Sequence, residues 1–273
     1  MEVINTPLLA PFLFITGIVF GSFLNVLSDR LPAERSILGR SNCESCKHVL
    51  AWYDLIPILS YFFLKARCRY CKAELSLYYP LVEIVTGTVF VMVWFLLPID
   101  QLHTISNLSQ SLIISLKILY EIIAAALLVV FFADLKSQII PDSMQTVLFI
   151  SAQIIRMIVF GFGVDVVLYS LVEGFIIMSP LLLLYVLTKG RGMGFGDVKL
   201  AFIIGVLFGV KIGIGVLYIS FVFGALVGLI LIISKKSGIK SKIAFGPFIV
   251  ASMFVALFYH DIVLVCIKKL WGV

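Results

Sequence analysis

Four cysteines in the first third of the sequence are spaced as metal ligands. They form two Cys-x-x-Cys pairs about twenty residues apart, Cys43 with Cys46 and Cys68 with Cys71. Each pair can present two thiolates from one tight turn, and four thiolates make the tetrahedral ligand set of a closed structural zinc site. The alternative is two disulfides. His48 could replace one cysteine as a ligand, or it could lie on the surface or beside the site without binding the metal. We favour the role without metal binding.

Two aspartates stand beside long apolar segments. A charged group costs about 2.5 to 3.5 kcal/mol at the bilayer centre on insertion scales, so each one calls for a functional hypothesis. Asp134 ends an apolar run, and Asp197 lies in GMGFGDVK at 192–199. Two carboxylates hydrolyse a bond when one is ionised and draws a proton from water while the other donates a proton. Like charges placed close together enforce that division, and the chemistry suits a peptidase.

Helix capping is the simpler role for these aspartates. Asp134 is expected at a helix C-terminus, where the dipole disfavours an anion, so capping does not explain it. For Asp197 capping and catalysis remain open. Asp142 follows Pro141 and precedes Gln145 by three residues, which predicts a capping box at the start of a helix.

Three neighbours of Asp197 are expected to support a substrate site: Gly194, Gly196 and Lys199. Glycines there would let a substrate strand approach and would allow backbone conformations closed to other residues.

Other acids lie within apolar segments. We expect Glu121 to pair with Lys117 one turn away. Glu83 and Glu173 have no assigned partner.

The elements that must position these residues are membrane helices. Of 273 residues, 62% are hydrophobic and 13% are charged, whereas about a quarter of a soluble domain is charged. The net charge of +6 resides mainly in short runs between apolar segments, so we expect no nucleic-acid binding. Glu2 and the lack of a basic residue before the first apolar run predict an uncleaved anchor rather than a signal peptide.

We expect an all-α polytopic membrane protein with about eight transmembrane helices and a small cytosolic zinc-binding insertion. The predicted spans are 7–27, 79–98, 112–132, 143–163, 166–188, 196–210, 212–234 and 243–265. The sixth is short and glycine-rich, so seven spans are the alternative. No internal repeat is expected.

Orientation follows from basic residues, which favour the cytoplasm in short loops. The segment between the first two spans holds eight of them: Arg30, Arg35, Arg40, Lys47, Lys65, Arg67, Arg69 and Lys72. Alternation places further basic residues on the same side: Lys136, Lys189, Arg191, Lys199, Lys235, Lys236, Lys240 and Lys242. Lys211, Lys268 and Lys269 fall on the other side. The cysteines are therefore expected in the reducing cytosol, where disulfides rarely persist.

Specific motifs give the chain a resemblance to the type IV prepilin leader peptidase/N-methyltransferase family. They are GSFLNV at 21–26 with RLP at 30–32, the two Cys-x-x-Cys pairs enclosing WYDLIP at 52–57 and LSY at 59–61, YPLVE at 79–83, Asp134 with IPD at 140–142, and GFGDVK at 194–199. The likeness runs from about residue 17 to 200, with Gly246-Pro247 beyond it. Two departures are Glu44, where the family commonly has Pro, and Ala66, where it has Gly.

This resemblance implies that Asp134 and Asp197 are the catalytic pair. It implies prepilin or pseudopilin precursors as substrates, whose basic leader is cut at the cytoplasmic face of the bacterial inner membrane. It also implies S-adenosylmethionine as the donor that methylates the new N-terminus. The expected domains are a first transmembrane helix at 1–27, a cytosolic zinc-binding loop at 28–78 and a transmembrane aspartic peptidase domain at 79–273.

Two other functions compete with this expectation. A presenilin-like intramembrane aspartic protease shares the GxGD element, but the cytosolic cysteine pairs argue against it. A small proton-coupled transporter would use its membrane carboxylates as proton sites, and an inverted repeat of interrupted helices would favour it; none is apparent in the sequence.

Overall fold

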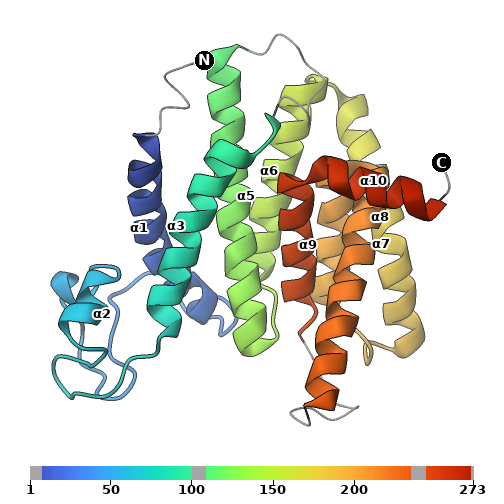
Figure 1. The fold of residues 1–273 in the computed structure, drawn as a ribbon. Helices are drawn as coiled ribbons and strands as arrows, with labels where there is room; N and C mark the ends of the chain where they lie inside the picture. Colours follow the sequence, from blue (N-terminus) through green and yellow to red (C-terminus); the bar gives the residue numbers. More distant parts are fainter. Residues whose placement is uncertain (1–7, 100–108, 235–243, 272–273) are drawn as a thin grey trace. The chain divides into compact units, whose positions relative to one another are not determined.

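The computed structural model describes residues 8–99, 109–234 and 244–271, and its regular elements are helices (Figure 1). The chain divides into two compact units, Met1–Phe95 and Leu96–Val273. The first unit contains α1 (Leu9–Arg30), η1 (Trp52–Asp54), α2 (Leu59–Phe63) and α3 (Tyr78–Leu96). The second contains α5 (Gln110–Ser137), α6 (Asp142–Phe160), α7 (Val164–Thr188), α8 (Phe195–Ile233), α9 (Gly246–Phe258) and α10 (His260–Trp271).

Glycines bring α1 and α3 into close contact in the first unit. A Cβ atom on Gly17 would lie 2.7 Å from the Cα of Gly87, and one on Gly21 would lie 2.7 Å from the Cα of Glu83. Small residues allow helices to approach closely where lipid offers no hydrophobic drive for association. Asn25 also donates a hydrogen bond to the Tyr79 carbonyl at 3.2 Å. The two helices thereby form a base for the loop between them.

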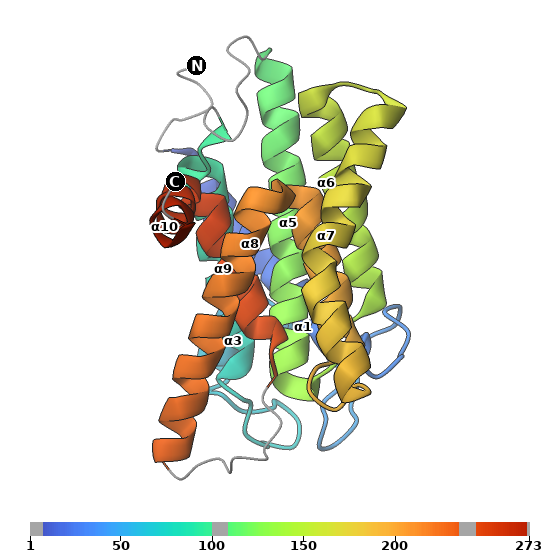
Figure 2. The same ribbon diagram turned by 90° about the vertical axis from the view of Figure 1, so that its right-hand side faces the viewer.

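The centre of the second unit is α5. Its inward face, from Leu116 to Ala133, includes several side chains that are fully buried, and α6 and α9 pack against it. Helix α7 lies side by side with α8 (Figure 2). Gly205 of α8 sits against the backbone of α7 at Glu173 and Gly174.

The long helix α8 is two helices that meet at Gly209. Gly209 has φ 74° and ψ 177°, which is not helical. A Cβ atom on Gly213 would lie 3.5 Å from Ile204 Cγ2. In a straight helix these two residues, nine positions apart, would be separated by about 13.5 Å along the axis. The chain therefore folds back on itself at this glycine.

The last apolar segment is also interrupted. Helix α9 ends at Phe258, and α10 continues at an angle of 104° (Figure 1). Tyr259, between them, has φ −128° and ψ 44°. Over its described residues, the predicted span at 243–265 thus consists of two helices rather than one continuous helix, and residue 243 lies outside the described residues.

Six helices in the described part of the chain are long and apolar enough to cross a membrane, or up to seven if the bent pair of α9 and α10 is one span. These agree with the predicted spans within a few residues, apart from the last. The predicted sixth and seventh spans correspond to the two parts of α8, with the break at Gly209. Lys235, Lys236, Lys240 and Lys242 lie outside the described residues.

We predict that Gly205→Ala lowers the free energy of unfolding by about 1 to 3 kcal/mol, as overpacking does. Its Cβ atom would lie 2.5 Å from the Glu173 carbonyl oxygen and 2.7 Å from the Gly174 Cα, and neither backbone atom can rotate away. Denaturant unfolding of the purified protein in detergent measures the change. The matched control is Gly224→Ala, also in α8, whose nearest neighbour would lie 3.4 Å away. Equal stability of the two variants would contradict the close contact between α7 and α8.

Candidate active site and metal centre

The four cysteines of the first unit meet at one point. Their sulfur atoms all lie within 4.8 Å of one another, and the Sγ atoms of Cys43 and Cys71 are 3.8 Å apart. A tetrahedral zinc with Zn–S bonds of about 2.3 Å requires sulfur atoms about 3.8 Å apart. The cluster therefore fits a four-thiolate zinc site, and all four thiols are free rather than disulfide-bonded. His48 is not part of the cluster; its ring stacks on Tyr70.

The two cysteine pairs lie in turns of the same construction. In each turn the backbone N–H of the first cysteine bonds to a carbonyl five residues on, Cys43 to His48 at 2.9 Å and Cys68 to Ala73 at 2.8 Å. The lysine after the second cysteine has a positive φ in both turns, 59° at Lys47 and 62° at Lys72. The structure thus contains a local repeat that was not predicted. The sequence signal is the shared pattern Cys-x-x-Cys-Lys.

Hydrogen bonds prepare part of this cluster for metal binding. The backbone N–H of Cys46 lowers the pKa of Cys43 to about 7, although burial acts in the opposite direction. For Cys71, the backbone N–H of Ala73 acts to lower the pKa, but burial and the neighbouring thiols together raise it to about 11. Four thiols this close cannot all ionise without a compensating cation. A divalent metal supplies that charge.

Asp54 connects the second cysteine turn to the middle of the loop. Arg69, between Cys68 and Cys71, donates a hydrogen bond to Asp54 Oδ1 at 2.6 Å, and the backbone N–H of Ala51 donates to Oδ2 at 3.3 Å. Burial raises the pKa of Asp54, but these hydrogen bonds outweigh it and hold the pKa below its usual value. The arrangement orders the segment between the two turns.

Glu83 of α3 holds the middle of the loop just before α2. Its Oε2 accepts a hydrogen bond from the backbone N–H of Ile58 at 2.7 Å, and Ile58 has an unusual φ of 60°. The residue that the sequence left unassigned therefore fixes the backbone just before α2.

In the second unit, Asp134 lies in the last turn of α5 and faces the start of α9. Only 5% of Asp134 is exposed. Its Oδ2 accepts a hydrogen bond from the backbone N–H of Gly246 at 3.0 Å. A Cβ atom on Gly246 would lie 2.6 Å from that oxygen, so only glycine permits the contact. The sequence signal for this partner is Pro247, because proline favours the first positions of a helix.

Asp197 lies in the first turn of α8 and is 7% exposed. The N-cap residue of α8 is Gly194, which has no side chain to cap the helix. Among the described residues Asp197 Oδ1 has no hydrogen-bond partner. Asp197 interacts electrostatically with Asp134. The two carboxylates are therefore close enough to interact. The backbone N–H of Gly194 also acts on the Asp197 carboxylate, so capping and catalysis both stay predictions for this residue.

The glycines beside Asp197 provide space, not unusual dihedral angles. Gly194 has φ −73° and ψ 146°, and neither Gly194 nor Gly196 has a positive φ. The expectation of a conformation closed to other residues is wrong. A Cβ atom on Gly196 would lie 3.1 Å from the Cβ of Ile140, so the loop before α6 packs directly on the segment that carries Asp197.

The predicted capping box at Asp142 is also wrong. Pro141 occupies the N-cap position of α6, and Asp142 is the first helical residue. Asp142 Oδ1 instead accepts a hydrogen bond from Lys199 Nζ at 2.7 Å. Gln145 Nε2 donates to the Gly196 carbonyl at 2.9 Å. Both side chains therefore attach the start of α6 to the first turn of α8.

The predicted pairing of Glu121 with Lys117 is electrostatic only. The charge of Lys117 acts on Glu121, but in the described part of the chain neither carboxylate oxygen of Glu121 has a hydrogen-bond partner.

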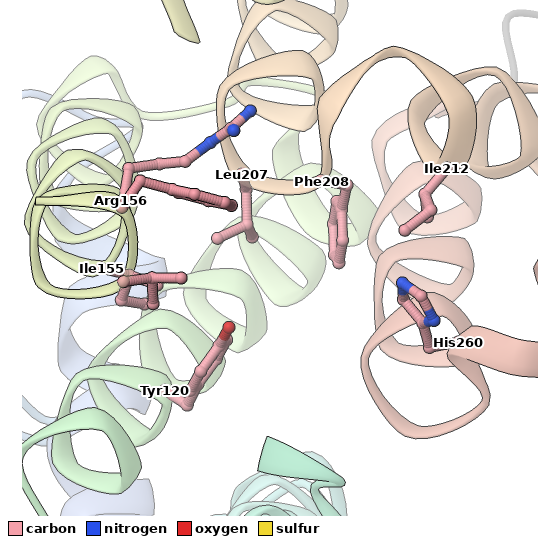
Figure 3. Close-up of a pocket in the computed structure, with 9 residues that line it drawn as sticks. Tyr120, Ile155, Arg156, Leu207, Phe208, Ile212 and His260 are labelled. Atoms are coloured by element: carbon pink, nitrogen blue, oxygen red, sulfur yellow. The ribbon is translucent and has the colours of Figure 1, made fainter. Parts of the chain in front are cut away.

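A cavity of about 90 Å³ lies among α5, α6, α8 and α10 (Figure 3). Nine residues line it: Tyr120, Ile155, Arg156, Val159, Phe160, Leu207, Phe208, Ile212 and His260. Neither Asp134 nor Asp197 is among them, so this cavity is separate from the aspartate pair.

Comparisons with known proteins match both units. Residues 15–97 match the bacterial peptidase A24 N-terminal domain, and residues 121–229 match the type IV leader peptidase family. Two relatives named prepilin leader peptidase/N-methyltransferase are similar over nearly the whole chain. The one from Bacillus subtilis is 28% identical over 252 residues, which are 91% of this chain and 94% of the relative. The one from Pseudomonas putida is 29% identical over 285 residues, 92% of each.

A relative of the same name from Myxococcus xanthus is 54% identical over 85 residues. This match covers 31% of the chain and 25% of the relative's length. No solved structure matches the chain significantly.

We predict that the purified protein carries one zinc per chain, because four thiolates at this spacing form a closed tetrahedral site. Cys43→Ser and Cys71→Ser should each lower the zinc content and make the loop more sensitive to protease. Elemental analysis and limited proteolysis measure the two effects. Cys266→Ser, which alters the one cysteine outside the loop, is the control and should retain the metal. A folded protein without zinc, or with disulfides in the loop, would contradict the prediction.

Proposed function

Because the chain belongs to the type IV prepilin leader peptidase/N-methyltransferase family, we propose that Asp134 and Asp197 are the catalytic pair of a membrane aspartic endopeptidase. Its substrates are prepilin or pseudopilin precursors, from which it removes the leader. The proposed location is the bacterial inner membrane, with the aspartates and the zinc loop on the cytosolic side, as the basic residues between the spans indicate.

The observation that best supports this proposal is the meeting of two buried carboxylates from distant parts of the chain. Each carboxylate lies beside a helix N-terminus: Asp134, from the end of α5, accepts a hydrogen bond from Gly246 at the start of α9, and Asp197 lies in the first turn of α8. A helix N-terminus stabilises negative charge. The two helices thus stabilise the single charge that the pair carries while it shares one proton.

This arrangement supports general acid–base hydrolysis. The ionised member of the pair draws a proton from a water molecule, which attacks the carbonyl carbon of the peptide bond. The protonated member donates its proton to the carbonyl oxygen. The proton taken from water is then delivered to the leaving amine. Asp197 Oδ1 is buried and has no hydrogen-bond partner within the described chain, so it can accept a hydrogen bond from a water molecule or substrate group that reaches it.

Gly194, Gly196 and Lys199 are proposed to support the substrate site. Gly194 is exposed beside Asp197, so an extended substrate backbone can come close to the carboxylate. Lys199 holds Asp142 of α6, and Gln145 holds the Gly196 carbonyl. These contacts fix the first turn of α8 against α6.

The zinc is proposed to be structural. Four protein ligands leave no open position for a water molecule, and a loop of this size gains most of its stability from a metal. The cysteines hold the metal, while Asp54 and Glu83 order the segment between the two cysteine turns.

Methylation of the new amino terminus is the second activity proposed. S-adenosylmethionine would supply the methyl group. Pockets for ligands of that size occupy about 300 to 1,000 Å³, so the cavity of about 90 Å³ does not fit this donor. We therefore assign no residue of this chain to the donor.

We predict that Asp134→Asn and Asp197→Asn each abolish cleavage of a prepilin-like substrate while the protein remains folded and zinc-loaded. An amide keeps the size of the side chain but cannot cycle between protonated and ionised forms. The double variant should be hardly slower than either single variant, because the two residues act as one unit. Intact-mass measurement of the substrate in a membrane assay records the cleavage.

The matched control is Asp142→Asn, since an asparagine oxygen can still accept the hydrogen bond from Lys199. Its cleavage rate should fall by less than about tenfold, which corresponds to about 1.4 kcal/mol. Near-normal cleavage by the Asp134 variant combined with loss in the Asp142 variant would place the first catalytic carboxylate at Asp142.

We further predict that cleavage and methylation are separable. Asp197→Asn should still methylate a supplied pre-cut pilin, because the family associates methyl transfer with the amino-terminal half of the chain. The methyl group is seen as a mass increase of the pilin. A variant that binds the pre-cut pilin normally but does not methylate it would show that the two activities share Asp197.

A further inference from the structure

The break in α8 interrupts the backbone hydrogen bonds of the helix inside the protein. In a continuous helix the N–H of Val210 would bond to the carbonyl of Val206. Gly209, between them, has φ 74° and ψ 177°, a region open essentially to glycine alone. The interruption therefore separates the two groups. Both need new partners, because lipid and packed side chains supply none.

Two charged side chains supply these partners. Arg156 of α6 donates from Nε to the Val206 carbonyl at 2.8 Å. Glu173 of α7 accepts at Oε1 from the Val210 N–H at 3.3 Å. The donor and the acceptor of the missing bond are thus satisfied separately, each by a side chain from a different neighbouring helix.

The signs of the two charges match the two helix ends. Arg156 is at the C-terminal end of the first part of α8, and Glu173 is at the N-terminal start of the second part, as the helix dipoles favour. The two side chains also form an ion pair with each other, and each is only 12% exposed. Figure 3 shows the guanidinium extending from α6 toward α8 beside Leu207, at the edge of the cavity.

Glycine is required at the break for a second reason. A Cβ atom on Gly209 would lie 2.9 Å from Glu173 Oε1 and 3.7 Å from Arg156 Nη2. The conformation and the space therefore both depend on this residue.

We propose that Arg156 and Glu173 are positioning residues for the peptidase reaction. The first part of α8 carries Asp197 in its first turn and ends at the break. By replacing the missing backbone bond, the pair fixes the far end of this helix and so the depth and rotation of Asp197. The inference rests on the proposed function, because it assigns Asp197 to catalysis.

An ordinary buried ion pair makes a different prediction from this backbone cap. Exchange of the two residues, Arg156→Glu with Glu173→Arg, preserves a plain ion pair. It abolishes the cap, because a carboxylate cannot donate to the Val206 carbonyl and a guanidinium cannot accept from the Val210 N–H.

The test compares four proteins: the exchanged double variant, Glu173→Leu, Glu173→Gln and the control Asp165→Asn, which alters an exposed carboxylate of the same helix. Hydrogen exchange of the segment around Val210 reports the cap, and cleavage kinetics with a prepilin-like substrate report the positioning of Asp197. In the double variant with the two residues interchanged and in Glu173→Leu, the amide hydrogens of this segment should exchange at least about tenfold faster than in the parent protein. Their kcat should fall by about tenfold or more with KM within about twofold, since misplacement by about 1 Å is enough for such a loss.

Glu173→Gln should remain closer to the parent protein than Glu173→Leu, because its amide oxygen still accepts from Val210. Asp165→Asn should match the parent. The proposal is overturned if the double variant with the two residues interchanged keeps the parental hydrogen-exchange rate and kcat. It is also overturned if Gln and Leu at position 173 have equal effects.

Failure of the proposed function is seen separately. Asp197→Asn should leave the exchange near Val210 unchanged while it abolishes cleavage. If Asp197→Asn cleaves normally, the assignment of the catalytic pair fails, and the exchange measurements still decide whether the pair caps the break.

Discussion

Every backbone polar group that is shut away from water must find a partner, and this constraint organises the whole molecule. Regular helices satisfy it internally. At three irregular points of the backbone, an acid from a neighbouring helix accepts the N–H group that is left over. Glu83 does so for Ile58, Asp134 for Gly246 and Glu173 for Val210. Acids that are costly in an apolar environment are thus located where the chain starts or breaks a helix.

The catalytic proposal uses the same constraint. The contact with Gly246 fixes the orientation of Asp134, while Asp197 lies in a helix turn whose own N–H groups favour a negative charge. The two carboxylates come from segments far apart in the sequence and are held by contacts around Ile140, which lies against both Gly196 and Gly246. The contacts that position the two carboxylates thus come from the protein itself.

Much of this arrangement could be predicted from the sequence. The four cysteines and the two aspartates have spacings or surroundings with few alternatives, and apolar length predicts most spans well. The predictions failed where the structure depends on tertiary contacts, which the local sequence does not determine. Pro141 takes the N-cap position, so Asp142 turns to Lys199. The bend at Tyr259 has no neighbouring proline or glycine to mark it in the sequence. Arg156 and Glu173 are 17 residues apart on different helices, so no periodicity links them.

The fold-back at Gly209 also has a consequence for how the protein enters the membrane during synthesis. The part of α8 before the break is about 21 Å long at 1.5 Å per residue, less than the hydrocarbon thickness of about 30 Å. A helix this short is a poor independent span, so we expect it to enter together with the part that follows. The ribosome has by then delivered α6 and α7. Arg156 and Glu173 can therefore neutralise each other in lipid before the ribosome delivers the two parts of α8 that they will hold.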